Sequence, residues 1–93
     1  MELTNEEDRR NRQKARKAEQ SQLLEWIAWS FEDGNYHTVD EMREELVADQ
    51  PINLTLKIWD SQAILRLLVS AAGINAGWRS FLNENHVILF IKK

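Results

Sequence analysis

The spacing of the apolar residues changes along the chain, and this change restricts the folds that the chain can adopt. In roughly the first three quarters of the chain, apolar residues recur every three or four positions, as do Leu23 and Ile27, which is the spacing of one helix face. Gly34, Pro51 and Gly73 interrupt this pattern and are typical of helix ends. The sequence therefore predicts three helices, over residues 4–32, 39–48 and 61–72. Thr38 followed by Glu41 predicts a capping box at the start of the second helix, and Asp60 is suited to cap the start of the third.

Nearer the C-terminal end the apolar residues alternate, which indicates β-strands. Residues 78–82 and 86–92 flank the turn residues 83–85 and predict a β-hairpin. Residues 87–91 are all apolar, so the second strand has two apolar faces and is expected at the centre of a small sheet. Residues 52–58 also alternate, and predict either an additional strand or the start of the third helix. The predicted fold class is α+β.

Composition and motifs restrict the chemistry. The chain has 93 residues, enough for one domain, and no cysteine, which excludes disulfides and cysteine-ligated zinc. Its two histidines are well separated and cannot form a metal site alone. No nucleophile–base arrangement and no glycine-rich phosphate loop is present. We therefore expect a protein that is not an enzyme, with no cofactor, no metal and no small-molecule substrate.

Neither a membrane span nor a secretion signal is predicted. The longest apolar run, residues 87–91, is far shorter than the roughly 20 residues that a membrane-spanning helix needs. The N-terminal residues are charged and lack the apolar segment of a signal peptide. The expected location is cytoplasmic, with no membrane partner.

The order of the predicted elements resembles that of a winged-helix domain. The resemblance covers residues 20–93, and a charged arm over residues 1–19 precedes it. It implies that helix 61–72 enters the DNA major groove and that the hairpin, as the wing, contacts the DNA backbone or minor groove. The segments that carry the resemblance are residues 23–27 in the first helix, 37–42 at the start of the second, 64–74 in the third, and the hairpin over 78–91.

Two segments depart from the winged-helix pattern. Residues 50–59 make the connection between the second and third helices longer than a helix-turn-helix usually has. Residues 83–86, at the tip of the wing, contain no Arg or Lys, which argues against wing contact with DNA. The alternative fold is an α+β domain in which residues 52–58 join the hairpin as a third antiparallel strand.

Positive charge is concentrated near the N-terminus. Residues 9–18 carry six basic and no acidic side chains, whereas residues 21–93 carry six basic and ten acidic ones. The arm is predicted to be helical or disordered, and its basic stretch is suited to contacting phosphates. On helix 61–72, Gln and Arg side chains are suited to base edges. The predicted nucleic-acid-binding residues are Arg9, Arg10, Arg12, Lys14, Arg16, Lys17, Lys57, Ser61, Gln62, Arg66 and Ser70.

Two tryptophans lie away from the apolar face of the first helix. At about 100° per residue, Trp29 falls nearly opposite Leu23 and Ile27, and Trp26 lies on the flank towards it. Large aromatic side chains on the back of a helix expose apolar surface that another segment is expected to cover. The candidates are the hairpin, the domain's own loops, a second subunit or another protein. This predicts a homodimer or a protein partner, with an interface of Ala15, Ala18, Gln22, Trp26 and Trp29.

These patterns lead to two functional hypotheses. The first is a small winged-helix DNA-binding protein, a transcriptional regulator of the phage or mobile-element type, favoured by the element order and the basic arm. The alternative is a winged-helix protein-interaction module, such as an adaptor or a phage-type inhibitor of host machinery. It is favoured by the acidic body, the absence of Arg and Lys from the wing tip and the tryptophan pair.

Overall fold

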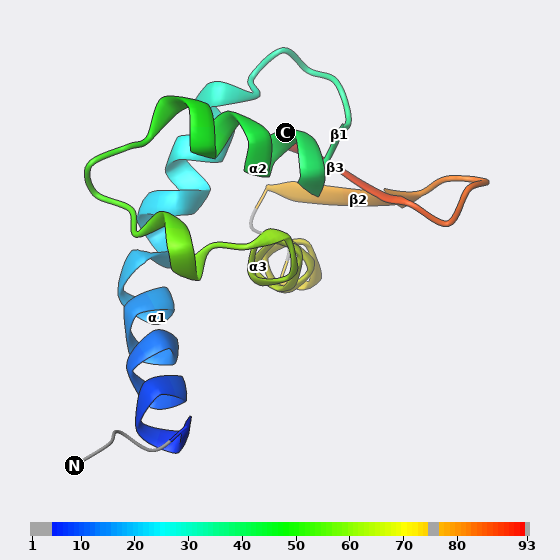
Figure 1. Ribbon diagram of the computed structural model, residues 1–93. Helices are drawn as coiled ribbons and strands as arrows, with labels where there is room; N and C mark the ends of the chain where they lie inside the picture. The colour runs from blue at the N-terminus through cyan, green and yellow to red at the C-terminus, as the bar shows by residue number, and fades with distance from the viewer. Residues whose placement is uncertain (1–4, 75–76, 93) are drawn as a thin grey trace.

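The structure, a computed structural model, describes residues 5–74 and 77–92 and combines three helices with a three-stranded antiparallel sheet (Figure 1). The α+β class is confirmed, and the three predicted helices and the hairpin form with ends that differ by one or two residues. In chain order the elements are α1 (Asn5–Ser30), β1 (His37–Thr38), α2 (Val39–Asp49), the 3₁₀-helix η1 (Leu56–Ile58), α3 (Ser61–Gly73), β2 (Trp78–Leu82) and β3 (Ile88–Lys92).

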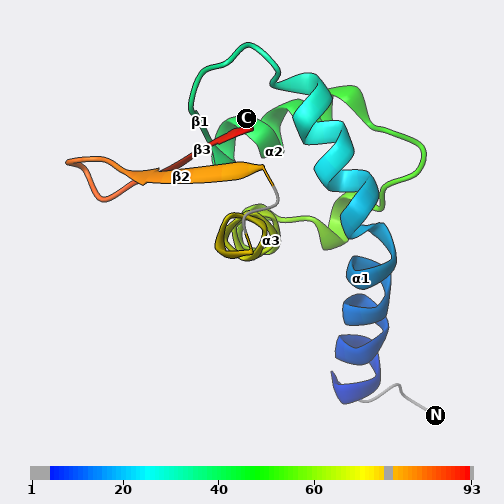
Figure 2. The same ribbon diagram turned by 180° about the vertical axis from the view of Figure 1, so that it is seen from behind.

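α1 packs on the rest of the chain only from near its middle, at Ala15, onward. Leu23 and Ile27 are fully buried in the core, and Ala15 is the first described apolar residue of the helix to contact it. The preceding part projects from the body (Figures 1 and 2), because residues 9–14 contain no apolar side chain to bury. The described part of the predicted arm is therefore helical, and residues 1–4 lie outside the described residues.

The start of α2 is fixed by the capping box that the sequence predicts. The Glu41 amide donates to the Thr38 hydroxyl at 3.1 Å, and the Thr38 amide donates to the Glu41 carboxylate at 3.3 Å. This exchange satisfies two backbone donors that a helix start leaves unpaired. Val39, Met42 and Leu46 are buried on the inner face of the helix.

The prediction of a strand over residues 52–58 is wrong. This segment contains a turn followed by η1, and the structure places no strand there. The Glu19 carboxylate of α1 accepts hydrogen bonds from the amide and hydroxyl of Thr55 and from Nε1 of Trp59. These bonds hold the segment against α1, where Leu54 and Ile58 are buried. Leu54 and Ile58 thus reach the core without a strand, whereas Ile52 is almost fully exposed. The Thr55 amide pairs with the Glu19 side chain, and the amides of Leu54, Ile58 and Trp59 pair with backbone carbonyls of the same segment.

The third helix starts where its cap predicts. The Asp60 carboxylate accepts a hydrogen bond from the Ala63 amide at 2.8 Å, and α3 begins at Ser61. The alternative start near residue 53 is therefore wrong as well. Ile64 and Leu68 are fully buried and Ala71 is nearly so, which gives α3 one continuous apolar face.

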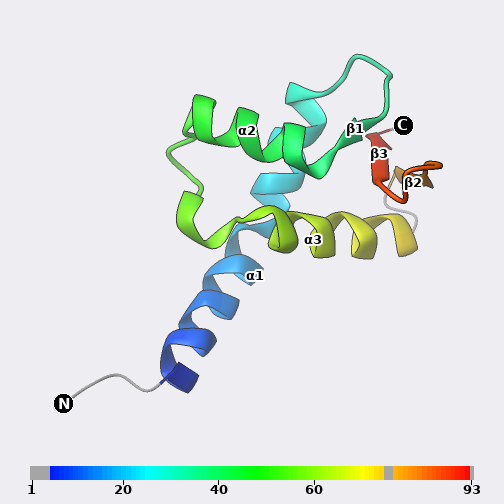
Figure 3. The ribbon, with the colours of Figure 1, turned by 45° about the vertical axis from the view of Figure 1, so that its right-hand side comes forward.

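The sheet has the order β1–β3–β2, so β3 occupies the centre as its two apolar faces predict. Trp78 pairs with Lys92 at one end of the hairpin, and Leu82 pairs with Ile88 at the other. The third strand is β1, in which His37 pairs with Phe90. Figure 3 shows α2 and α3 running beside each other at one side of the sheet. The arrangement is compatible with a winged-helix-like fold. No helix in the described ranges is long and apolar enough to cross a bilayer.

Candidate nucleic-acid interface

A groove between α1 and α3 brings predicted nucleic-acid-binding residues together. Arg16 and Gln20 line it from α1, and Arg66 and Ser70 line it from α3. Its volume is about 210 Å³, and Trp59, Ala63 and Leu67 complete the lining. Two guanidinium groups, an amide and a hydroxyl therefore face one space, although Arg16 and Arg66 lie far apart in the sequence.

The α1 side of this groove is held in place by hydrogen bonds to the η1 segment. The Nε of Arg16 donates to the Ile58 carbonyl at 3.0 Å in a partly buried setting. Three residues further along the helix, Glu19 holds Thr55 and the buried Trp59. Because both side chains are tied to the same short segment, the Arg16 guanidinium is positioned beside the Trp59 surface before any ligand arrives.

The exposed face of α3 carries a polar row. Gln62, Arg66 and Ser70 recur at intervals of four residues and are all exposed, together with Val69. Ser61 is set apart from this row, because its hydroxyl donates to the Asp40 carboxylate of α2 at 3.2 Å. It is therefore half-buried and serves the contact between two helices.

Gln62 also borders a second groove, between the starts of α2 and α3 and the hairpin. The volume of this groove is about 260 Å³. Asp40 supplies the carboxylate among its lining side chains, and no Arg or Lys of the described residues takes part. The remaining lining residues are Thr38, Val39, Ser61, Leu65, His86, Val87 and Ile88. This surface is therefore poorly suited to phosphate. The groove between α1 and α3 differs from it because two arginines line that groove.

The other predicted basic residues lie along the projecting half of α1 and on η1. Arg9 and Arg16 are seven residues apart and share the side of the helix that faces the groove, with Arg12 close to it. By the same spacing, the predicted residues Arg10, Lys14 and Lys17 lie on the opposite side of α1. Lys57 is exposed on η1, next to the Ile58 carbonyl that holds Arg16.

The wing tip is built from side-chain hydrogen bonds and contributes no positive charge. Oδ1 of Asn83 accepts from the amides of Asn85 and Val87, both at 2.9 Å, and His86 adopts a positive φ of 61°. On the strands of the hairpin, Lys92 lies over the ring of Trp78, 5.8 Å from its centroid. The expectation of little wing contact with phosphate fits this geometry.

The two tryptophans predicted at an interface have different environments. Trp26 is half-buried, and its Nε1 donates to the Asp49 carboxylate at 2.6 Å. Pro51 and Leu54, from the loop after α2, line a small hollow beside this ring, and Trp29 borders the same hollow. Trp29 stays 70% exposed. Cover by the hairpin is excluded for both, because Trp78 is buried in the core and Phe81 contacts the ring of Tyr36.

The smaller residues of the predicted interface also lie in different environments. Ala15 packs against the core cluster and does not belong to the outer face of α1, which corrects its assignment to the strip. Ala18 and Gln22 are exposed, on the side of the helix that also carries Trp29. The free part of the predicted interface is therefore Ala18, Gln22 and Trp29.

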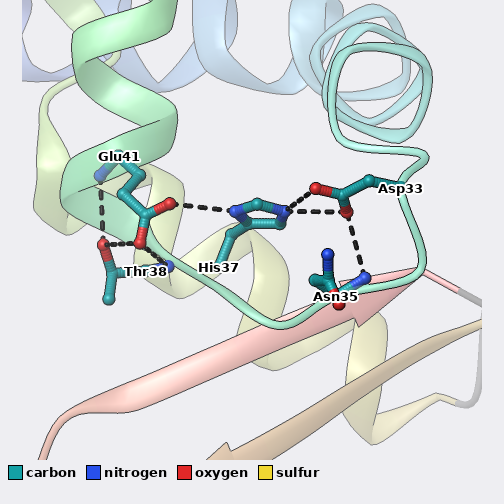
Figure 4. A network of polar contacts seen from close by, with 5 residues as sticks. All are labelled: Asp33, Asn35, His37, Thr38 and Glu41. Carbon is teal, nitrogen blue, oxygen red and sulfur yellow. Dashed lines mark hydrogen bonds and ion pairs between the residues drawn. The ribbon is translucent and has the colours of Figure 1, made fainter.

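A histidine between two carboxylates joins the end of α1 to the start of α2 (Figure 4). Nδ1 of His37 lies 2.9 Å from Glu41, and Nε2 lies 2.9 Å from both carboxylate oxygens of Asp33. Burial acts to lower the pKa of His37, but the hydrogen bonds to Glu41 and Asp33 outweigh it, and the pKa is raised. The same bonds lower the pKa values of Asp33 and Glu41.

This network of Asp33, His37 and Glu41, called the clamp below, has a structural role. It links the turn after α1 to the capping box of α2, and the His37 ring also packs on Phe31 with centroids 4.7 Å apart. Within residues 5–74 and 77–92, no group of three or more His, Cys, Asp or Glu side chains is arranged to hold a metal ion.

Sequence reasoning missed Gln20 in the groove and the exposed pair of Tyr36 and Phe81, whose ring centroids are 5.8 Å apart. Neither follows a periodic pattern, since each depends on contacts between distant segments.

Comparisons with family models, curated proteins and solved structures found no significant match. Function is therefore inferred from the geometry of these surfaces.

Proposed function

We propose that the protein binds double-stranded DNA through α3 and the projecting half of α1. The observation that carries this proposal is the groove that Arg16 and Arg66 line together with Gln20 and Ser70. Guanidinium groups form bidentate hydrogen bonds with phosphates and with guanine edges, and amides suit adenine. The groove therefore presents the side-chain chemistry of a DNA interface on a rigid helical frame.

The two helices would take different parts in binding. The exposed face of α3, with Gln62 and Arg66, is suited to the major groove, which admits one helix. Arg9, Arg12 and Arg16 continue the positive charge along α1 and are suited to phosphates, whose contacts position a protein without reading sequence. Because the wing tip contains no Arg or Lys, binding would depend on the helices. A single domain of this kind would act as a transcriptional regulator by occupying its site, as small regulators of phages and mobile elements do.

The test is duplex binding measured by fluorescence anisotropy across a series of salt concentrations. Arg66→Ala should weaken binding to a selected site by about 1–3 kcal/mol and relax specificity at one base position. Replacing Arg9, Arg12 and Arg16 by Gln should weaken all sequences alike and flatten the salt dependence. Arg79→Ala, on β2, is the matched control and should leave affinity unchanged. Wild-type protein without salt-sensitive duplex binding at low ionic strength contradicts the proposal.

A second candidate function, recognition of a protein partner as an adaptor or inhibitor, is favoured by the hairpin. Tyr36, Phe81 and Leu82 are 43%, 52% and 59% exposed, which is unusual for large apolar side chains, and β2 is an edge strand. Under this function, Phe81→Ser would abolish co-purification of a specific partner and leave the melting temperature and duplex affinity unchanged. A partner retained by that variant would contradict the assignment of this surface.

A further inference from the structure

The outer face of α1 carries opposite charges at its two ends. In the projecting half, Arg10, Lys14 and Lys17 follow one another at spacings of four and three and are all exposed. Further along the same line lie Glu25 and, just beyond the helix end, Glu32, both also exposed. Residues spaced in this way lie on one helix face. Residues 19–32 contain three acidic and no basic side chains, whereas residues 9–18 contain six basic and no acidic ones.

The same face holds a large apolar group without a cover. Trp29 is 70% exposed. Ala18, one turn beyond Lys14, has a small side chain that does not project far from the helix. Neither Lys17 nor Glu25 forms an ion pair with another residue in the described ranges. The face therefore presents apolar area and unpaired charge of both signs.

We propose that this face pairs two copies of the chain, with their α1 helices antiparallel about a two-fold axis near Ser21, an exposed residue of the same face. Lys17 and Glu25 are each four residues from Ser21, so the pairing places Lys17 of each copy opposite Glu25 of the other. Arg10 lies eleven residues before Ser21 and Glu32 follows the end of the helix, so the basic end of each α1 lies toward the acidic end of the other. A two-fold interface makes each of these contacts twice.

A second copy is the occupant because its own basic half supplies the charge that the acidic half lacks, at the matching spacing. A parallel pairing is excluded, since it would set like charges against each other. In the antiparallel register, Trp29 of one copy lies opposite residue 13 of the other, next to Lys14. An ammonium group at the face of a tryptophan ring is attracted to it, which gives the exposed ring a favourable environment.

The pairing leaves the groove beside Arg66 open. Arg16 lines that groove and Arg9 lies on the same side of α1, whereas Arg10, Lys14 and Lys17 lie away from it. Each copy in the pair would therefore keep one complete groove. The inference goes beyond DNA binding and stands independently of it, because it concerns the full chain without nucleic acid.

The test is sedimentation velocity of the full chain, without DNA, at low and high salt. Wild type should form a dimer at low salt whose dissociation constant rises with salt, because exposed charges are screened. Trp29→Ala should raise the dissociation constant about tenfold or more. Ile74→Ala is the matched control, since Ile74 is 76% exposed at the far end of α3, and it should leave the dimer unchanged. A wild-type monomer at every concentration at low salt overturns the proposal.

Charge reversal tests the register. Lys17→Glu and Glu25→Lys each set like charges against one another in a self-pair, so each variant alone should be monomeric. Mixed together, the two variants restore opposite-charge contacts, and a heterodimer should form. Circular dichroism confirms that each variant is folded, which both exposed positions allow. Self-dimers as strong as wild type, or a mixture that stays monomeric, would overturn the antiparallel register.

Discussion

At the scale of single residues, long-range hydrogen bonds from α1 hold the segment that departs most from its sequence pattern. Glu19 accepts from Thr55 and Trp59, and Arg16 donates to Ile58, across 36 to 42 positions of sequence. A periodic pattern shows which side chains are apolar, but it does not show which distant carboxylate will satisfy a backbone amide. Residues 52–58 alternate as a strand does, and the local signal alone predicts a strand.

Glu19→Ala should therefore destabilise the protein although the side chain is not in the apolar core. The variant leaves the Thr55 amide and the Trp59 indole without their acceptor, which costs about 1–3 kcal/mol. Urea unfolding measures this loss. Glu44→Ala, at an exposed position of α2, is the control and should change the free energy of unfolding very little. Equal unfolding midpoints for both variants would contradict the role assigned to Glu19.

His37 gives the stability of the fold a defined pH dependence. The raised pKa of His37 contributes stability that is full below the unfolded value, about 6.5, and is lost as pH rises through the folded value. The lowered pKa values of Asp33 and Glu41 contribute stability above their unfolded values, about 4, which is lost as pH falls through the folded values. The clamp is therefore strongest between about pH 4.5 and 6.5.

The expected result for His37→Gln is a drop in melting temperature that is largest near pH 5.5 and smaller above pH 8, as estimated from ordinary pKa values at about 4 and 6.5. The effect should be modest, because both carboxylates are half exposed and solvent screens their attraction to the imidazolium. Thermal unfolding over a pH series measures it, with His86→Gln as the control outside the network. A difference between wild type and His37→Gln that is constant over pH would contradict the clamp.

At the scale of elements, the sequence predicts what depends on near neighbours. The capping box of Thr38 and Glu41, the Asp60 cap and the central position of β3 are confirmed, because each depends on local hydrogen bonds or on the polarity of two strand faces. The identity of the third strand was missed. β1 has only two residues, too few for an alternating pattern, and it is defined by its pairing with Phe90 and Leu89.

Part of the geometry of the candidate site also follows from local spacing. The helical spacing places Gln62, Arg66 and Ser70 on one face of α3, and the structure shows them exposed there. That Arg16 would join them depends on the angle at which α1 crosses α3, which no local pattern encodes. Ala15 was misplaced because a helical projection does not show how far the body extends along the helix.

Leu68 tests the phase of α3. It is fully buried, so Leu68→Ala should cost about 2–5 kcal/mol, enough to unfold much of a small domain. Leu67 is half-buried at the edge of the groove, and its truncation should cost less. Val69→Ala is the control, because this side chain is 48% exposed. Equal losses of stability for Leu68→Ala and Val69→Ala would show that the assigned inner face of α3 is wrong.

At the scale of the whole molecule, the shape is set by one projecting helix. The principal extents are 49 × 27 × 23 Å, and the first half of α1 makes the long dimension (Figure 1). A solitary helical segment of this length is marginal in water, because it gains no tertiary packing. Stability is therefore distributed unevenly between the projecting half of α1 and the body.

Hydrogen exchange should show this unequal stability directly. At low protein concentration, amides of residues 9–14 should exchange through local fraying, much faster than those of residues 23–30, which lie on the core. Raising the concentration should slow exchange in residues 9–14 if copies pair through α1. Uniform protection along the whole helix in dilute protein would contradict the picture of a projecting, weakly held segment.

The sheet order has a consequence for synthesis. β1 follows α1 directly in the chain, but its partner is β3, the last of the described elements to leave the ribosome. Until β3 is made, Phe90 is missing from the core and β1 has no neighbour, so α1, α2 and α3 have no completed domain to join. At about 5–20 residues per second, the nascent chain spends a few seconds with Trp59 and Ile64 incompletely covered. Folding of the domain is thus delayed until β3 has left the ribosome.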